Sequence, residues 1–266
     1  GPPGSLMDSP FGALRLAQDR EHSPQWVRHP RMQWRYAYAR AAETRAQGEV
    51  GQDVIVLDGR PERLNFALAD GVSQSFYGDL AASALGDGLV GWLGQLAPGQ
   101  TSEQVSLGLA GLLEKLRVEV TEDVDVFPLP KDLPPMLLEV LNQKRQLGSE
   151  SMFVCGSIWL DPGKLLLCWL GDIRCRLWRD GREEKLEGLF RTQDRWSSRR
   201  GPVAGPPQLH FAPLQGLSRL MIYSDGLASL DALPDPPTDE ALQAAIDAAG
   251  RSPTSDDISF LDIVFS

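Results

Sequence analysis

The sequence predicts an α+β fold in which antiparallel strands form the core and helices cover it. Apolar residues in 78–117 recur at spacings of three and four, which is typical of amphipathic helices. Between residues 151 and 178, short apolar runs are separated by turns too short for parallel crossover connections. A chain of 266 residues suits one large domain or two small ones, and it can bury a large core without disulfides.

The first thirty residues show no periodic pattern. Residues 1–6 read as a cloning scar in front of Met7. Residues 7–30 are polar and interrupted by prolines, so we expect an irregular tail or a loosely docked arm. The predicted folded domain therefore spans residues 31–266.

The spacing of apolar residues predicts the elements of that domain. We expect strands at 34–39, 53–58, 64–69, 152–155, 158–160, 165–170, 174–178, 220–223 and 258–265, and helices at 78–96, 102–117, 135–146 and 239–249. Residues 121–135 are acidic and proline-rich, which indicates a loop. Residues 183–216 also lack periodicity, and a loop of that length is uncommon unless it is functional.

Composition excludes several classes of protein. Apolar residues make up 42% and charged residues 23%, as in ordinary globular proteins. The net charge of −10 disfavours nonspecific nucleic-acid binding, and no apolar stretch is long enough to span a membrane. Cys155, Cys168 and Cys175 lie among apolar residues without a CxxC spacing, so we expect buried thiols and a reducing, cytoplasmic location.

Aspartates recur at the ends of predicted strands. The five are Asp53, Asp70, Asp172, Asp225 and Asp256. Three of them adjoin a glycine, which lets a backbone carbonyl or a ligand approach closely. Hard dications such as Mg²⁺ and Mn²⁺ prefer carboxylate, carbonyl and water oxygens. A single Asp-Gly is usually only a turn, as we expect for Asp180-Gly181, so the inference depends on the combination and its order.

That order resembles a known family. The segments are Gly51-Gln52-Asp53, Ala69-Asp70-Gly71-Val72, Leu170-Gly171-Asp172-Ile173-Arg174, Tyr223-Ser224-Asp225-Gly226-Leu227 and Ser255-Asp256-Asp257-Ile258-Ser259. Each is a weak signal alone, but five in order beside hydrophobic strands are a strong one. From about Trp34 onward the chain resembles the PPM (type 2C) family of metal-dependent serine/threonine protein phosphatases, and most closely its bacterial branch.

The resemblance implies a fold and a set of metal ligands. The implied fold is a four-layer α/β/β/α sandwich, with two antiparallel sheets flanked by helix pairs. Asp70 would bridge two Mg²⁺ or Mn²⁺ ions, with the Gly71 carbonyl on one and Asp225 and Asp256 on the other. Asp172 would share a third, weaker ion with Asp225. Asp53 would orient metal-bound water from outside the coordination shell.

The implied activity is hydrolysis of phosphomonoesters by a metal-bridging water, with a phosphoprotein as substrate and a serine/threonine kinase as partner. Three alternatives remain. A pseudophosphatase would keep the fold and metals as a binding module, although clustered carboxylates are costly to retain without cations. A phosphatase of small molecules and a purely structural sandwich are the other two.

The sequence departs from the family pattern at the expected leaving-group and phosphate contacts. Residues 72–75 after Asp70-Gly71 contain no histidine, and the three histidines of the chain, His22, His29 and His210, lie in the predicted tail and long loop. The phosphate-binding arginine is displaced, and Arg45 is the nearest candidate; its alternative role is a solvated surface charge.

Two further assignments stay open from the sequence. Asp257 follows Asp256 directly, so either could be the metal ligand, although the spacing to the last strand favours Asp256. The arginines of 183–216, namely Arg191, Arg195, Arg199 and Arg200, could form a basic flap that recruits phosphopeptides, or a solvated loop.

Overall fold

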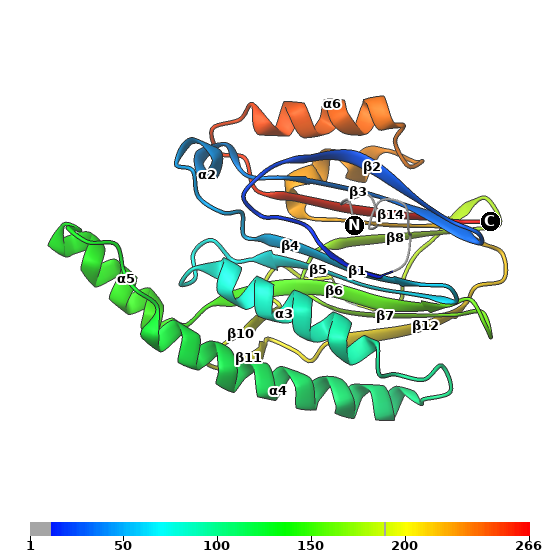
Figure 1. Ribbon diagram of the computed structural model, residues 1–266, viewed down its shortest axis with the longest axis horizontal. Coiled ribbons are helices and arrows are strands. Elements are labelled where there is room, and N and C mark those ends of the chain that lie inside the picture. Colours follow the sequence, from blue (N-terminus) through cyan, green and yellow to red (C-terminus); the bar gives the residue numbers. More distant parts are fainter. Residues whose placement is uncertain (1–11, 189) are drawn as a thin grey trace, which may run out of the picture.

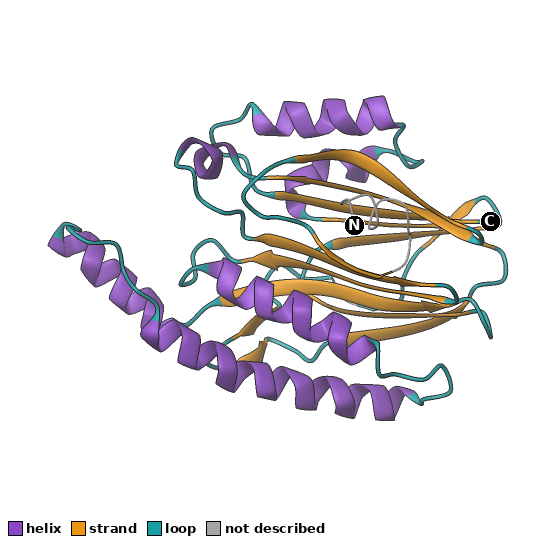
Figure 2. Ribbon diagram, viewed as in Figure 1, coloured by secondary structure: helices purple, strands orange, loops and turns teal. Residues whose placement is uncertain are grey.

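Two antiparallel sheets pack face to face in the computed structural model, which describes residues 12–188 and 190–266 (Figures 1 and 2). One sheet contains β1 (Gly12–Arg15), β4 (Asp53–Arg60), β5 (Arg63–Gly71), β6 (Glu150–Trp159), β7 (Lys164–Leu170), β10 (Arg195–Ser197), β11 (Gly201–Val203) and β12 (Gln208–Pro213). The other contains β2 (His22–His29), β3 (Met32–Ala39), β8 (Arg174–Arg179), β9 (Arg182–Glu184), β13 (Leu217–Tyr223) and β14 (Ile258–Phe265).

Helices cover both outer faces of this sandwich (Figure 2). The helices α3 (Gly78–Leu93) and α4 (Ser102–Val126) lie on the first sheet. On the second sheet, α6 (Asp239–Gly250) is accompanied by the 3₁₀ helix η1 (Asp225–Ala232). The predicted four-layer α/β/β/α sandwich is therefore confirmed, with a 3₁₀ helix as one member of the second helix pair.

The alternation of side chains along β4 shows how the layers are held together. Ile55 and Leu57 point into the core between the sheets, whereas Val54 and Val56 point into the core under α3 and α4. Because successive strand residues face opposite sides of the sheet, one continuous apolar run contributes side chains to both hydrophobic cores. At the start of α4, Thr101 and Gln104 form a capping box that satisfies the first backbone amides.

Two shorter helices lie outside these layers. The helix α2 (Ala42–Ala46) precedes β4, and α5 (Pro135–Leu147) follows α4 and projects beyond the sheets (Figure 1). No described residue of α5 is buried, and Met136 exposes 80% of its surface. Among the residues that the structure describes, no helix combines the length and apolarity needed to span a membrane.

The prediction of an irregular tail is wrong for most of residues 12–29. The strand β1 pairs with β4, and β2 pairs with β3. The strand β2 was missed because it lies at a sheet edge, where its exposure alternates only weakly and Pro24 coincides with a register shift between His22 and Gln25. Proline is tolerated at such edges because no neighbouring strand needs its missing amide. The presumed cloning scar at 1–6 lies outside the described residues.

Other predicted boundaries also need correction. The helix α4 continues through Val126, into the predicted loop, because Val120 and Val124 lie four residues apart and are both buried. The predicted long loop 183–216 contains the short strands β9 to β12, of which β10 and β12 pair with the distant strands β6 and β7. Cys155 and Cys168 are buried as expected, whereas Cys175 is only partly buried.

Candidate metal centre and active site

The β4–β5 hairpin places Asp53 directly opposite Asp70 at one end of the sheet. Asp53 is fully buried, and its Oδ2 accepts a hydrogen bond from the Ser259 hydroxyl at 2.8 Å. Its Oδ1 is also buried but has no hydrogen-bond partner among the described residues. A buried carboxylate oxygen without a donor is costly, so this position favours either a bound ligand or a proton on one of the two carboxyls.

Burial and neighbouring charge raise the pKa of both carboxyls. For Asp53, the pKa is raised by burial and then by the negative charge of Asp257. For Asp70, the pKa is raised well above its ordinary value by burial and then by Asp53, with Asp172 and Asp256 adding to the effect. Carboxyls that resist ionisation in this way can be stabilised as anions by a bound cation.

A cleft of about 560 Å³ opens at this end of the sandwich, beside α2. Its lining includes Gly71 and seven carboxylates: Glu43, Glu49, Asp70, Asp172, Asp225, Asp256 and Asp257. No described lysine, arginine or histidine lines it. All five residues that the sequence analysis named as metal ligands therefore line one cleft, and Asp53 lies next to Asp70 behind it.

Glycines let the backbone pack closely around these aspartates. A Cβ on Gly71 would lie 2.6 Å from the carbonyl group of Gly78, so the loop that follows Asp70 can approach α3 only with glycine. Gly171 has a φ of 115°, and its missing side chain leaves room for Met152 directly before Asp172. These close approaches position the strand-end aspartates that the sequence pattern singled out.

The donor set fits hard dications, although the ligands are not fully gathered. Asp70, Asp172, Asp225 and Asp256 supply carboxylate oxygens, which Mg²⁺ and Mn²⁺ prefer. Within residues 12–188 and 190–266, no three acidic, histidine or cysteine side chains converge into a ready-made coordination shell. Asp225 instead forms an ion pair with Arg174, whose Nη1 lies 2.7 Å from Asp225 Oδ1.

The outer aspartates influence one another through charge. Burial and then the charge of Asp225 raise the pKa of Asp172, while Arg174 opposes the shift. Burial and then Asp225 also raise the pKa of Asp256. The negative charges of these three residues are thus close enough to repel, which a shared cation would relieve.

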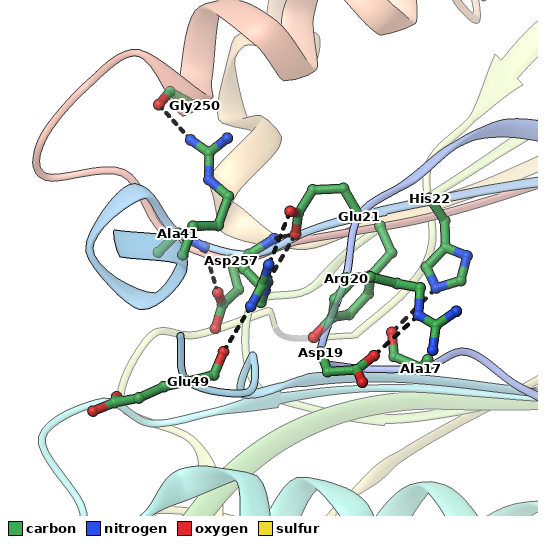
Figure 3. A network of polar contacts seen from close by, with 12 residues as sticks. Ala17, Asp19, Arg20, Glu21, His22, Ala41, Glu49, Gly250 and Asp257 are labelled. Atoms are coloured by element: carbon green, nitrogen blue, oxygen red, sulfur yellow. Dashed lines mark hydrogen bonds and ion pairs between the residues drawn. The ribbon is translucent and has the colours of Figure 1, made fainter. Parts of the chain in front are cut away.

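Asp256 and Asp257 have different surroundings. Asp257 Oδ1 accepts a hydrogen bond from the Ala41 amide at 2.6 Å (Figure 3), and its Oδ2 accepts one from the Gln52 amide at 2.8 Å. Both of its oxygens therefore hold the α2 loop and the start of β4 in place. Asp256 is exposed at the cleft, with its carboxylate available, which favours it as the ligand.

The structure does not bring Arg45 to the cleft. Its Nη2 donates a hydrogen bond to the Gly250 carbonyl at 2.9 Å, at the end of α6. The neighbouring Arg40 is bound to the Glu21 carboxylate and the Glu49 carbonyl. None of the histidines His22, His29 and His210 lines the cleft in the described part of the chain.

The arginines of residues 183–216 are held in ion pairs. Arg191 pairs with Asp194, and Arg199 pairs with Asp125 of α4. Arg195 and Arg200 both pair with Glu150, a largely buried residue at the start of β6. These contacts tie the segment to the sheet and to α4, and they leave no described arginine of this group in the cleft.

Sequence reasoning missed the roles of Glu150 and Arg174. Arg174 lies two residues after Asp172, within a segment that the sequence analysis quoted, so its position was visible but its partner was not. The spacing of residues along one strand does not reveal that η1, about fifty residues later, supplies that partner.

Comparisons with solved structures find the same fold of two antiparallel sheets and flanking helices in PPM-type serine/threonine phosphatases. The serine/threonine phosphatase Stp1 from Staphylococcus aureus matches with a TM-score of 0.61 and 13% identity, over 92% of this chain and 98% of that chain. The catalytic domain of the serine/threonine protein phosphatase PstP, in complex with 2 manganese ions, matches with a TM-score of 0.56 and 16% identity, over 90% of this chain and 99% of that chain.

RsbX in complex with magnesium gives a TM-score of 0.56 and 14% identity, over 91% of this chain and 100% of that chain. No protein-family model and no curated protein matches the sequence. The chain therefore has the PPM phosphatase fold over nine-tenths of its length, with a sequence far diverged from these neighbours.

Proposed function

We propose that this protein is a metal-dependent serine/threonine protein phosphatase that hydrolyses phosphomonoesters. The observation that carries the proposal is the cleft, which gathers Asp70, Gly71, Asp172, Asp225 and Asp256 without any described basic side chain. A phosphate group cannot bind such an anionic surface unless cations lie between them. Manganese and magnesium in the complexes of PstP and RsbX are consistent with this chemistry.

The residues have separate roles in this proposal. Asp70, the Gly71 carbonyl, Asp225 and Asp256 would hold two Mg²⁺ or Mn²⁺ ions, and Asp172 with Asp225 would take a third. When bound, the ions supply an acidified water molecule and neutralise the phosphoryl oxygens. Asp53, buried beside Asp70, would orient water through its Oδ1 and limit the movement of Asp70.

The test is hydrolysis of p-nitrophenyl phosphate and of a phosphothreonine peptide with Mn²⁺, Mg²⁺ or EDTA. We expect turnover with either ion and none with EDTA. A preference for the peptide would support a phosphoprotein substrate and a partner kinase, whereas a preference for the small ester would favour a small-molecule phosphatase. Turnover that EDTA leaves unchanged would refute the proposal.

A pseudophosphatase is the second candidate, because the described cleft lacks both the histidine and the arginine that the family resemblance led us to expect. A pseudophosphatase would bind Mn²⁺ and its melting temperature would rise with the metal, but it would hydrolyse neither p-nitrophenyl phosphate nor the phosphothreonine peptide. The hydrolysis assay, combined with the melting temperature measured with and without Mn²⁺, therefore separates the two candidates. The cytoplasmic location stays a prediction from the cysteine content.

A further inference from the structure

Arg174 lies where two of the proposed metal ligands meet. Its Nη1 donates to Asp225 Oδ1 at 2.7 Å and to the backbone carbonyl oxygen of Asp172 at 3.2 Å. One guanidinium nitrogen therefore joins the start of β8 to the start of η1. Of the seven cleft carboxylates, only Asp225 has an ion-pair partner among the described residues.

The guanidinium of Arg174 is also held by a second aspartate, Asp231. Its Nη2 lies 3.1 Å from Asp231 Oδ2, and its Nε contacts both oxygens of the same carboxylate at 3.3 Å. Asp231 also accepts a hydrogen bond from the Tyr223 hydroxyl at 2.6 Å. Because Asp231 lies within η1, the planar guanidinium of Arg174 is held against the helix that begins with Asp225.

The positive charge of the Arg174 guanidinium repels a metal ion bound beside Asp225. A metal ion shared by Asp172 and Asp225 would lie next to the guanidinium and would compete with Nη1 for Asp225 Oδ1. Asp70 has no arginine partner in the described structure, so an ion held by Asp70 and the Gly71 carbonyl, without Asp225, does not meet this competition. At a half-exposed site, one like charge a few ångströms away lowers the affinity for a dication by about ten-fold.

We propose that Arg174 is a built-in counter-ion of the cleft, which weakens the binding of the ion shared by Asp172 and Asp225 relative to that of the ion held by Asp70 and the Gly71 carbonyl. The inference rests on the proposed metal-dependent function, and it assigns the order in which the ions bind. In this arrangement Arg174 acts through Asp225 as a positioning residue and does not contact the substrate.

The test is a Mn²⁺ titration of the full chain, followed by calorimetry and by the electron paramagnetic resonance signal of free Mn²⁺. Arg174→Gln keeps a hydrogen-bond donor but removes the charge, and Arg174→Lys keeps the charge. Arg176→Gln is the matched control, because Arg176 lies two residues along β8 and binds the Leu230 and Leu233 carbonyls near η1 without contacting Asp225. Melting in EDTA checks that each variant is folded.

We expect Arg174→Gln to tighten the weakest Mn²⁺ site about ten-fold, with the tightest site unchanged. Arg174→Lys and Arg176→Gln should retain the wild-type isotherm. An unchanged or weakened isotherm in folded Arg174→Gln would overturn the inference, because the arginine would then orient Asp225 without competing for it.

The wild-type titration tests the proposed function separately. If the wild type binds no Mn²⁺, the proposed phosphatase function fails. The counter-ion inference would then still be supported if Arg174→Gln gained a site, and it would be refuted if this variant also bound none.

Discussion

Asp53 and Asp70 illustrate how much of the site depends on single carboxylates. The two lie opposite each other in the β4–β5 hairpin, and Asp53 has a buried oxygen without a described donor. Without a cation, both must either remain protonated or repel each other. Their retention in the interior is therefore best explained by the proposed metal ions.

Asp70→Asn tests this assignment. We expect metal-dependent turnover to fall by about 100-fold or more, since the proposed bridging ligand is lost, while the melting temperature in EDTA stays the same or rises because one buried carboxyl is removed. Asp180→Asn is the matched control, because Asp180 lies in a turn with φ 51° that asparagine tolerates, and it is not part of the cleft. Full turnover in Asp70→Asn would contradict the assignment.

The raised pKa values predict how metal-free stability depends on pH. A carboxyl whose pKa is higher in the folded than in the unfolded protein binds protons more tightly when folded, so stability falls as pH rises through the folded pKa. Asp53 and Asp70 both have raised pKa values. In EDTA, the melting temperature should therefore be higher near about pH 5 than near about pH 8.

Saturating Mn²⁺ should remove or reverse this slope, because the ions bind the ionised carboxylates. The control is Asp79→Asn, since burial raises the pKa of Asp79 to about 6 and it does not line the cleft. That variant should flatten part of the slope equally with and without metal. A slope in EDTA that rises with pH would contradict the electrostatic interpretation.

At the scale of elements, Asp257 connects the α2 loop to the start of β4 through two backbone amides. Asp257→Ala should lower the free energy of unfolding in EDTA by about 2–4 kcal/mol, since two hydrogen bonds to a charged acceptor are lost. Asp256→Asn should leave that free energy nearly unchanged and weaken Mn²⁺ binding. Urea unfolding and Mn²⁺ titration of the pair decide which aspartate is the ligand, and the opposite pattern would make it Asp257.

The elements that the sequence predicted well are those with strong local patterns. The β-branched run in 53–58 and the turns between 152 and 178 gave β4, β6, β7 and β8 because each of those strands pairs with a near neighbour in the chain. The edge strand β2 was missed because its exposure alternates only weakly and Pro24 coincides with a register shift, whereas the short strand β10 was missed because its partner β6 lies far away in the sequence. A strand of three residues is too short to show an alternating pattern of apolar and polar residues.

The residues of the candidate site likewise differ in how well the sequence could place them. Strand-end aspartates could be placed from the sequence, because the ends of neighbouring strands meet at one edge of a sheet. The orientation of Arg45 could not, since it depends on the position of Gly250 at the end of α6. The ion pair of Arg174 depends likewise on the path of η1.

At the scale of the whole molecule, charge predicts a preference among substrates. The chain carries a net charge of −10, and seven carboxylates line its cleft. A phosphothreonine peptide flanked by lysines should therefore show a kcat/KM about ten-fold higher than one flanked by glutamates at low ionic strength, with the difference shrinking as salt is added. A difference that does not depend on salt would indicate shape recognition instead.

The projecting helix α5 has a consequence for how the molecule opens. A helix of 13 residues without a buried side chain receives little support from tertiary packing, and such a helix is marginal in water. Its amides should therefore exchange with deuterium through local opening, long before those of β5 and β6 at the centre of the sandwich. Brief trypsin treatment should cut first near Lys131 and Lys144, and would leave the two sheets and their aspartate cleft intact.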